Sequence, residues 1–229
     1  MPDLYEDDNG VIRVLVDRLG HDLEPSILIG GWATFVRVGG EISLDIDLIT
    51  SQESRHKLEN LMTDLSPSHN HQGRKLRAII DDVHLDIYLP FESQLGSKLR
   101  LKVEVLAEYP DELSFEKWTL LRLEAHIATK MAALLDRHFS EKGQKDAREI
   151  LALLKLEGLD ASVAAEVLHR ASTVPIGELP TMIGEAFDLI GNIIRLSKAD
   201  QKLVASTKKS WVTALRARGL LPQESRPQL

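Results

Sequence analysis

The hydrophobic periodicity of this chain changes near Ser114, and that change limits the folds that are open to it. Before this point, short apolar runs that alternate with polar residues lie between helical segments, which is typical of a small mixed β-sheet with helices. After it, the remaining segments carry only helical spacing. The sequence therefore predicts an α+β fold, with a mixed-sheet core in residues 1–115 and an all-helical domain in residues 116–229 that closes a cleft over it.

The boundaries of the expected elements follow from this spacing and from the Gly and Pro breaks between segments. In the first half we expect strands at residues 26–29, 42–48, 76–80, 83–89 and 99–105. The helices expected there cover residues 11–19, 32–38 and 50–65. In the second half we expect helices at residues 120–135, 144–156, 162–171, 181–196 and 200–218.

Composition and the start of the chain exclude several classes of protein. No cysteine occurs among the 229 residues, which excludes disulfide scaffolds, thiolate zinc sites and cysteine nucleophiles. The first residues are acidic and lack the apolar centre of a secretory signal. No apolar run approaches the ~18 residues of a membrane span. We therefore expect a soluble, cytoplasmic protein that makes no membrane contact.

The charge is distributed unevenly between the two halves. Residues 1–115 hold 11 basic and 21 acidic side chains, a net charge of −10, whereas residues 116–229 hold 17 and 14, a net charge of +3. This asymmetry indicates either two modules with different roles or only a difference between solvated surfaces. Two basic groups are candidates for nucleic-acid contacts. They are Lys208, Lys209, Arg216 and Arg218 near the end, and Arg74, Lys75 and Arg77 beside the expected hairpin.

The strongest local signal combines a glycine pair with two aspartates. Gly30 and Gly31 end a short apolar strand, and Asp45 and Asp47 lie on the next expected strand. Aspartates at positions i and i+2 of a strand point to the same face, with Cα atoms ~6–7 Å apart. Two like charges at this spacing are costly unless a cation lies between them, and Mg²⁺ prefers carboxylate and phosphate oxygens. The glycines allow backbone N–H groups to approach a phosphate.

A third acid, Asp86, lies on a later expected strand. If that strand neighbours the one with Asp45, the three carboxylates meet beside the glycine pair, which is a layout for metal-assisted phosphoryl transfer. Gly30-Gly31, 13 intervening residues, Asp45-Ile46-Asp47 and the later Asp86 together resemble the DNA-polymerase-β-type nucleotidyltransferases. This resemblance implies that the α+β half is a nucleotidyltransferase core and that the three acids bind Mg²⁺ or Mn²⁺.

The second half narrows the resemblance to one family. Lys130 and Arg137 are seven positions apart and share a helix face, and Lys145-Asp146 opens the next helix. This arrangement resembles the AbiEii/AbiGii-type nucleotidyltransferase toxins of type IV toxin–antitoxin systems. The resemblance covers about residues 25–155. It implies that Lys130 contacts a triphosphate and that Arg137 lies at the nucleotide site. Asp146 would orient Lys130 or a sugar hydroxyl.

One position departs from the family pattern. Members of the family often have an arginine shortly before a Ser or Thr that precedes the acid pair. Here Ser43 occupies the Ser/Thr position, but position 41 is Glu41 and the nearest arginine is Arg37. Ser43 is expected to share the strand face of the aspartates and to bind a phosphate. Arg37 is expected to reach the site from the end of its helix.

The resemblance implies an enzyme that transfers nucleotides from an NTP to RNA, with the 3′ end of tRNA as the favoured acceptor and a cognate antitoxin as a partner. The attack on the α-phosphate would release pyrophosphate, with Asp86 activating the attacking hydroxyl. One alternative keeps this chemistry but has a small molecule or a protein side chain as acceptor. A second alternative is a non-catalytic regulatory module on the same fold.

Overall fold

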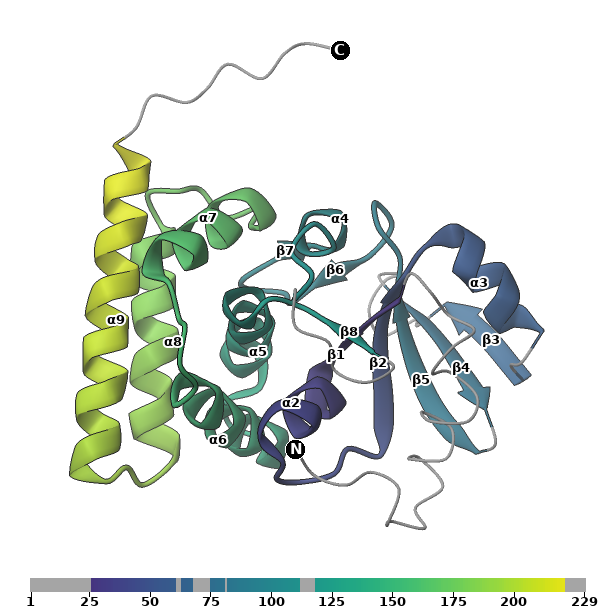
Figure 1. The fold of residues 1–229 in the computed structure, drawn as a ribbon, viewed down its shortest axis with the longest axis horizontal. Helices are drawn as coiled ribbons and strands as arrows, with labels where there is room; N and C mark the ends of the chain where they lie inside the picture. The colour runs from purple at the N-terminus through teal and green to yellow at the C-terminus, as the bar shows by residue number, and fades with distance from the viewer. Residues whose placement is uncertain (1–25, 61–62, 68–74, 81, 112–117, 221–229) are drawn as a thin grey trace.

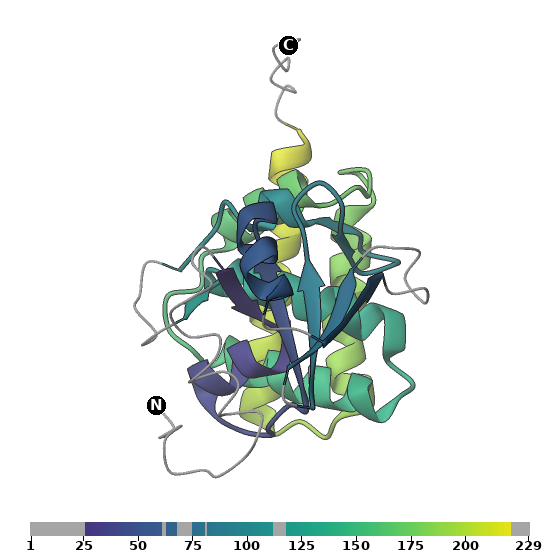
Figure 2. The same ribbon diagram turned by 90° about the vertical axis from the view of Figure 1, so that its right-hand side faces the viewer.

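A computed structural model describes residues 26–60, 63–67, 75–80, 82–111 and 118–220, and it shows a mixed α+β fold. The helix expected at residues 11–19 lies outside this part of the chain. In Figure 1 the strands lie on one side of the molecule and the helices of the second half lie on the other. Figure 2, which looks from the strand side, shows these helices behind the sheet.

The main sheet has six strands in the order β3-β4-β5-β2-β1-β8. β2 pairs with β1 antiparallel and with β5 parallel, and β4 pairs antiparallel with both β3 and β5. β8 pairs parallel with β1 although it follows residue 115. The strands are β1 Ser26–Ile29, β2 Asp45–Thr50, β3 Thr63–Pro67, β4 Leu76–Ile80, β5 Val83–Tyr88 and β8 Thr119–Leu120. A second, two-stranded sheet consists of β6 Gln94–Leu95 and β7 Leu101–Lys102.

Eight helices occur in the described part of the chain. Three helices of the second half begin at side-chain caps: Ser140, Asp160 and Ser197 each accept a hydrogen bond from a backbone N–H of the first turn. In the first half lie α2 Gly30–Val38, α3 Gln52–Glu59 and α4 Val103–Leu106. In the second half lie α5 Leu123–Arg137, α6 Glu141–Leu154, α7 Ala161–Ala171, α8 Leu179–Ile193 and α9 Lys198–Gly219.

The two faces of the sheet contribute to different apolar clusters. Ile29 and Ile49 pack in the large cluster that α5 to α9 build. Leu28 and Leu48, which point to the opposite face, pack in a smaller cluster with Trp32 of α2. Because side chains alternate along a strand, Asp45 and Asp47 share the face of Ile49. The acid pair is therefore directed toward the helices of the second half.

Three elements of the first half differ clearly from the sequence-based expectation. The strand expected at 42–48 begins only at Asp45, because Gly39 and Gly40 adopt positive φ angles and the chain reaches the sheet later. The helix expected at 50–65 ends at Glu59, and the following Thr63–Pro67 is the edge strand β3. In the segment 99–105, Val103 and Leu106 are buried at helical spacing, so β7 ends early and α4 follows.

No helix in the described ranges is long and apolar enough to cross a membrane.

Candidate active site

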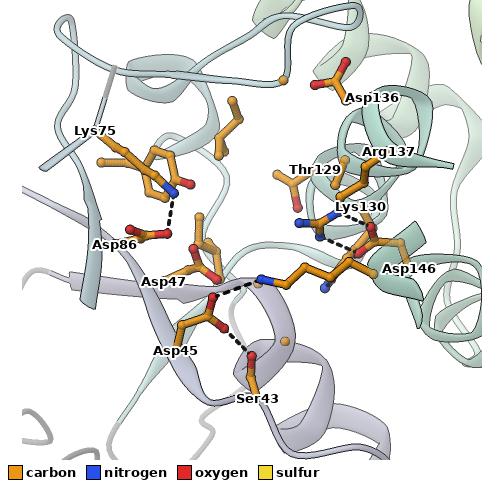
Figure 3. Close-up of a pocket in the computed structure, with 18 of the residues that line it drawn as sticks. Ser43, Asp45, Asp47, Lys75, Asp86, Thr129, Lys130, Asp136, Arg137 and Asp146 are labelled. Carbon is orange, nitrogen blue, oxygen red and sulfur yellow. Dashed lines mark hydrogen bonds and ion pairs between the residues drawn. The ribbon is translucent and has the colours of Figure 1, made fainter. Parts of the chain in front are cut away.

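A cavity of about 450 Å³ lies between the strands and the α5–α6 pair. Side chains from β2, β5 and the start of β4 form one side, which we call the sheet wall: Asp45, Asp47, Lys75, Arg77 and Asp86. Side chains from α5 and α6 form the other side, the helix wall: Lys130, Arg137, Lys142, Lys145, Asp146 and Glu149. Figure 3 shows both walls facing the same space.

The glycine pair lies at the floor of the cavity and leaves no room for larger residues. Gly30 has a φ angle of +70°, and a Cβ atom on it would lie 2.1 Å from Oδ2 of Asp47. A Cβ atom on Gly31 would lie 2.9 Å from Oγ of Ser43. Glycine is therefore required at both positions by close approach and, at Gly30, also by backbone conformation. The turn between β1 and α2 therefore packs directly against the side chains of Asp47 and Ser43.

Asp45 and Asp47 differ in electrostatic environment although they are two positions apart. Burial opposes the ionisation of Asp45, but the Ser43 hydroxyl, which donates to Oδ1 at 2.6 Å, and Lys142 hold its pKa below the usual value. Burial and then the charges of Asp45 and Asp86 raise the pKa of Asp47 to about 7. The charge of Asp45 is therefore compensated by its neighbours, whereas burial and the two adjacent carboxylates disfavour the charge of Asp47.

Asp86 lies beside Asp47 in the parallel pairing of β2 with β5. Its Oδ2 accepts a hydrogen bond from the buried Lys75, and its Oδ1 lies 3.2 Å from Nε of Arg77. The expected meeting of three acids is thus present, but Asp86 is engaged by two basic side chains. Among the described residues, no group of three or more His, Cys, Asp or Glu side chains is arranged to hold a metal ion.

The Asp45–Asp47 pair nevertheless fits a hard divalent cation. Mg²⁺ usually keeps several waters and is bound through one or two carboxylates together with substrate phosphates. Both carboxylates line the cavity, and the absence of a Cβ on Gly30 lets the Asp47 carboxylate pack against the glycine turn. A cation there would also offset the burial and the carboxylate repulsion that together raise the pKa of Asp47.

The helix wall is held together by its own ion pairs. Lys130, only 6% exposed in its side chain, lies 2.5 Å from Glu149 and 3.7 Å from Asp146. Arg137 donates two hydrogen bonds to Asp146, at 2.7 and 2.9 Å. Asp146 therefore touches both basic side chains expected at the site. Of the two acids near Lys130, Glu149 is the closer partner and Asp146 the more distant one.

The N-terminal part of α6 carries two further basic side chains toward the sheet wall. Nζ of Lys142 lies 3.8 Å from Asp45, and the Lys142 side chain is 70% exposed. Nζ of Lys145 lies 4.0 Å from Glu41, the residue that stands where the family often has an arginine. The Lys142 contact connects the two walls, whereas Lys145 contacts Glu41, which does not line the cavity.

Arg37 is the one expected site residue that does not line the cavity. Its buried guanidinium lies 2.5 Å from Asp111 and also donates to the backbone carbonyl of Leu121. The expectation that Arg37 reaches the site from the end of its helix is therefore wrong: its side chain joins the end of α2 to the segment around β8. All the other expected site residues line the cavity: Gly30, Gly31, Ser43, Asp45, Asp47, Asp86, Lys130, Arg137 and Asp146.

Sequence reasoning missed several residues of the cavity. Glu149 lies three positions after Asp146, so helical spacing places both on one face of α6, a signal that was present in the sequence. Lys142 likewise precedes Asp146 by four positions. Lys75 was named only as part of a basic group, because nothing in the spacing showed that it is buried against Asp86.

The basic group near the end of the chain does not line the cavity. Nζ of Lys208 lies 2.6 Å from Asp188, and Arg218 lies 3.9 Å from Glu166.

Comparison with known protein families found no match, and comparison with curated proteins found none either. The geometry of the cavity therefore carries the functional argument.

Proposed function

We propose that this chain is a Mg²⁺-dependent nucleotidyltransferase of the AbiEii/AbiGii toxin type, with an NTP as donor and RNA as acceptor. The supporting observation is one cavity in which an acid pair lies beside a glycine turn and faces a basic helix wall. An acid pair without enough positive charge suits a divalent cation, and a basic wall suits a triphosphate. This combination is specific in its chemistry, whereas each part alone is common.

The two walls would divide the work of binding. Asp45 and Asp47 would hold the cation, which would offset the charge that develops on the phosphate oxygens. Gly30 and Gly31 would let the triphosphate approach the backbone. Lys130, Arg137 and Lys142 would supply positive charge to the phosphates. Of these three, Arg137 and Lys142 are the more exposed, with side chains 42% and 70% exposed.

In the proposed reaction, a hydroxyl oxygen of the acceptor attacks the α-phosphorus. A new O–P bond forms, the bond to the β-phosphate oxygen breaks, and pyrophosphate leaves. Asp86 would accept the proton of the attacking hydroxyl, since it lies beside Asp47 in register and lines the cavity. The choice of RNA, with the tRNA 3′ end favoured, and the existence of a cognate antitoxin rest on the family resemblance.

The test uses each of the four NTPs, labelled at the α-phosphate, with total cellular RNA, total protein and a small-molecule extract in Mg²⁺ buffer. We expect label in a tRNA-sized band with the wild-type chain. Asp45→Asn is the matched control, because it removes a ligand charge while it keeps the side-chain size. Label in protein or in small molecules would move the acceptor to the first alternative. No incorporation into any fraction would support the non-catalytic alternative.

A further inference from the structure

The sheet wall contains a buried basic side chain among its carboxylates. The side chain of Lys75 is 8% exposed, whereas that of Arg77, the other basic residue of this wall, is 49% exposed. A buried ammonium group is costly unless it is paired. The pairing partner of Lys75 is Asp86, the acid of the adjacent strand. The ring of Tyr88, whose centroid lies 5.8 Å from Nζ, adds a favourable contact.

The charge of Lys75 acts on the whole acid cluster. Its field lowers the pKa of Asp45 and that of Asp47, against the larger effect of burial on both. Arg77 approaches the other oxygen of Asp86 from the more exposed side. Both oxygens of Asp86 are thus engaged by cations of the chain itself. A metal ion that bridged Asp47 and Asp86 would have to lie beside the Lys75 ammonium.

Charge counting shows what this arrangement permits. Asp45, Asp47 and Asp86 carry three negative charges when ionised, and Lys75 and Arg77 carry two positive charges. One divalent ion at the Asp45–Asp47 pair would more than balance the remaining charge. A second divalent ion a few ångströms from a buried ammonium would be strongly repelled by it. Water and salt screen the repulsion between buried charges much less than that between exposed charges.

We propose that Lys75 is a built-in cation that occupies the second cation position, so that the site takes one divalent ion per chain instead of two. This inference rests on the proposed function, because it takes the Asp45–Asp47 pair as the metal site. Lys75 would then hold Asp86 in place beside the acceptor hydroxyl without a metal bond. It is a positioning residue in this role, since it acts through Asp86.

The experiment counts Mn²⁺ ions bound per chain, from the electron paramagnetic resonance signal of free Mn²⁺ in a titration at pH 8. We expect one ion for the wild-type chain and none at this site for the double variant Asp45→Asn with Asp47→Asn. Lys75→Met keeps the length of the side chain and removes the charge, so a second ion is expected. Adding Asp86→Asn to Lys75→Met should return the count to one.

Arg77→Met is the matched control, because it removes the other partner of Asp86 but leaves the buried ammonium in place. Its count should remain one. Two ions on the wild-type chain, or a single ion on a folded Lys75→Met variant, would overturn the role of Lys75 while the proposed function stands. A wild-type chain that binds no more Mn²⁺ than the Asp45/Asp47 double variant would instead overturn the metal site. If Lys75→Met does not fold, as judged by circular dichroism, the wild-type count decides alone.

Discussion

The sheet wall and the helix wall differ in how their charges are compensated. On the helix wall, Lys130 and Arg137 are matched by Asp146 and Glu149 within hydrogen-bond or ion-pair distance. On the sheet wall, Lys75 and Arg77 both bind Asp86, which leaves the adjacent acid pair without a close partner from its own wall. The helix wall is therefore assembled before any ligand binds. The sheet wall keeps an electrostatic cost that a ligand can relieve.

The largest effect should come from removing a carboxylate of the acid pair. Asp47→Asn should lower nucleotide transfer by ~10³-fold or more, because the stabilisation that a metal ion gives to a transition state is worth several kcal/mol. The variant should remain folded, since it removes a repelled charge and not a partner. Single-turnover rates and circular dichroism check both parts. Transfer at the wild-type rate would remove Asp47 from the metal site.

The pH dependence of the stability of Asp47→Asn tests whether the charge of Asp47 destabilises the folded protein. The pKa of Asp47 is raised from 3.8 in the unfolded chain to about 7 in the folded protein without metal. The folded state therefore binds more protons between these values, and the contribution of Asp47 to stability is lost as pH rises toward 7. In metal-free buffer, Asp47→Asn should be more stable than wild type at pH 8, with the difference shrinking toward pH 4. Urea unfolding at both pH values measures it.

Removing a basic partner from the helix wall should lower the stability of the protein, whereas Asp47→Asn should raise it at pH 8. Lys130→Met leaves Glu149 buried without its closest basic partner, which costs ~3–5 kcal/mol in comparable buried pairs. Adding Glu149→Gln removes the orphaned charge and should recover most of the loss. Chemical denaturation of the two variants tests this. Equal stability of Lys130→Met and wild type would mean that the helix wall is not pre-assembled by its ion pairs.

Two glycines with nearly equal positive φ angles distinguish the cost of backbone strain from damage to the site. Gly30 and Gly39 have φ angles of +70° and +71°, but only at Gly30 would a Cβ atom meet Asp47. Gly39→Ala should cost ~1–3 kcal/mol, because Gly39 has φ 71° and ψ −158°, a combination almost restricted to glycine, and it should leave activity unchanged. Gly30→Ala should carry this cost and also displace Asp47, with activity lost. If both variants lose activity equally, close approach at Gly30 is not what matters.

The contents of the two walls were accessible from sequence to different degrees. The acid pair of the sheet wall could be predicted, because period-two spacing puts Asp45 and Asp47 on one face. The place of Asp86 depends on the parallel pairing of β2 with β5, which the sequence analysis could state only as a condition. The basic side chains that pair with these acids could not be predicted. Lys75 lies next to a strand start, where no periodicity fixes its direction, and Arg37 was assigned to the site from motif order although Asp111 holds it elsewhere.

The smallest expected effect concerns the contact that joins the two walls. Lys142 lies on α6 yet approaches Asp45 at 3.8 Å, and exposed ion pairs of this kind contribute ~0–1 kcal/mol. Lys142→Ala should therefore hardly change stability, but it removes a phosphate-facing charge and should raise the NTP KM several-fold. Lys209→Ala, an exposed lysine on α9 that does not line the cavity, is the control. It should leave the NTP KM unchanged and slightly flatten the salt dependence of RNA binding, because each phosphate contact adds ~0.7–0.9 to that slope. A shift in NTP KM with Lys209→Ala but not with Lys142→Ala would show that the triphosphate does not meet the helix wall at α6.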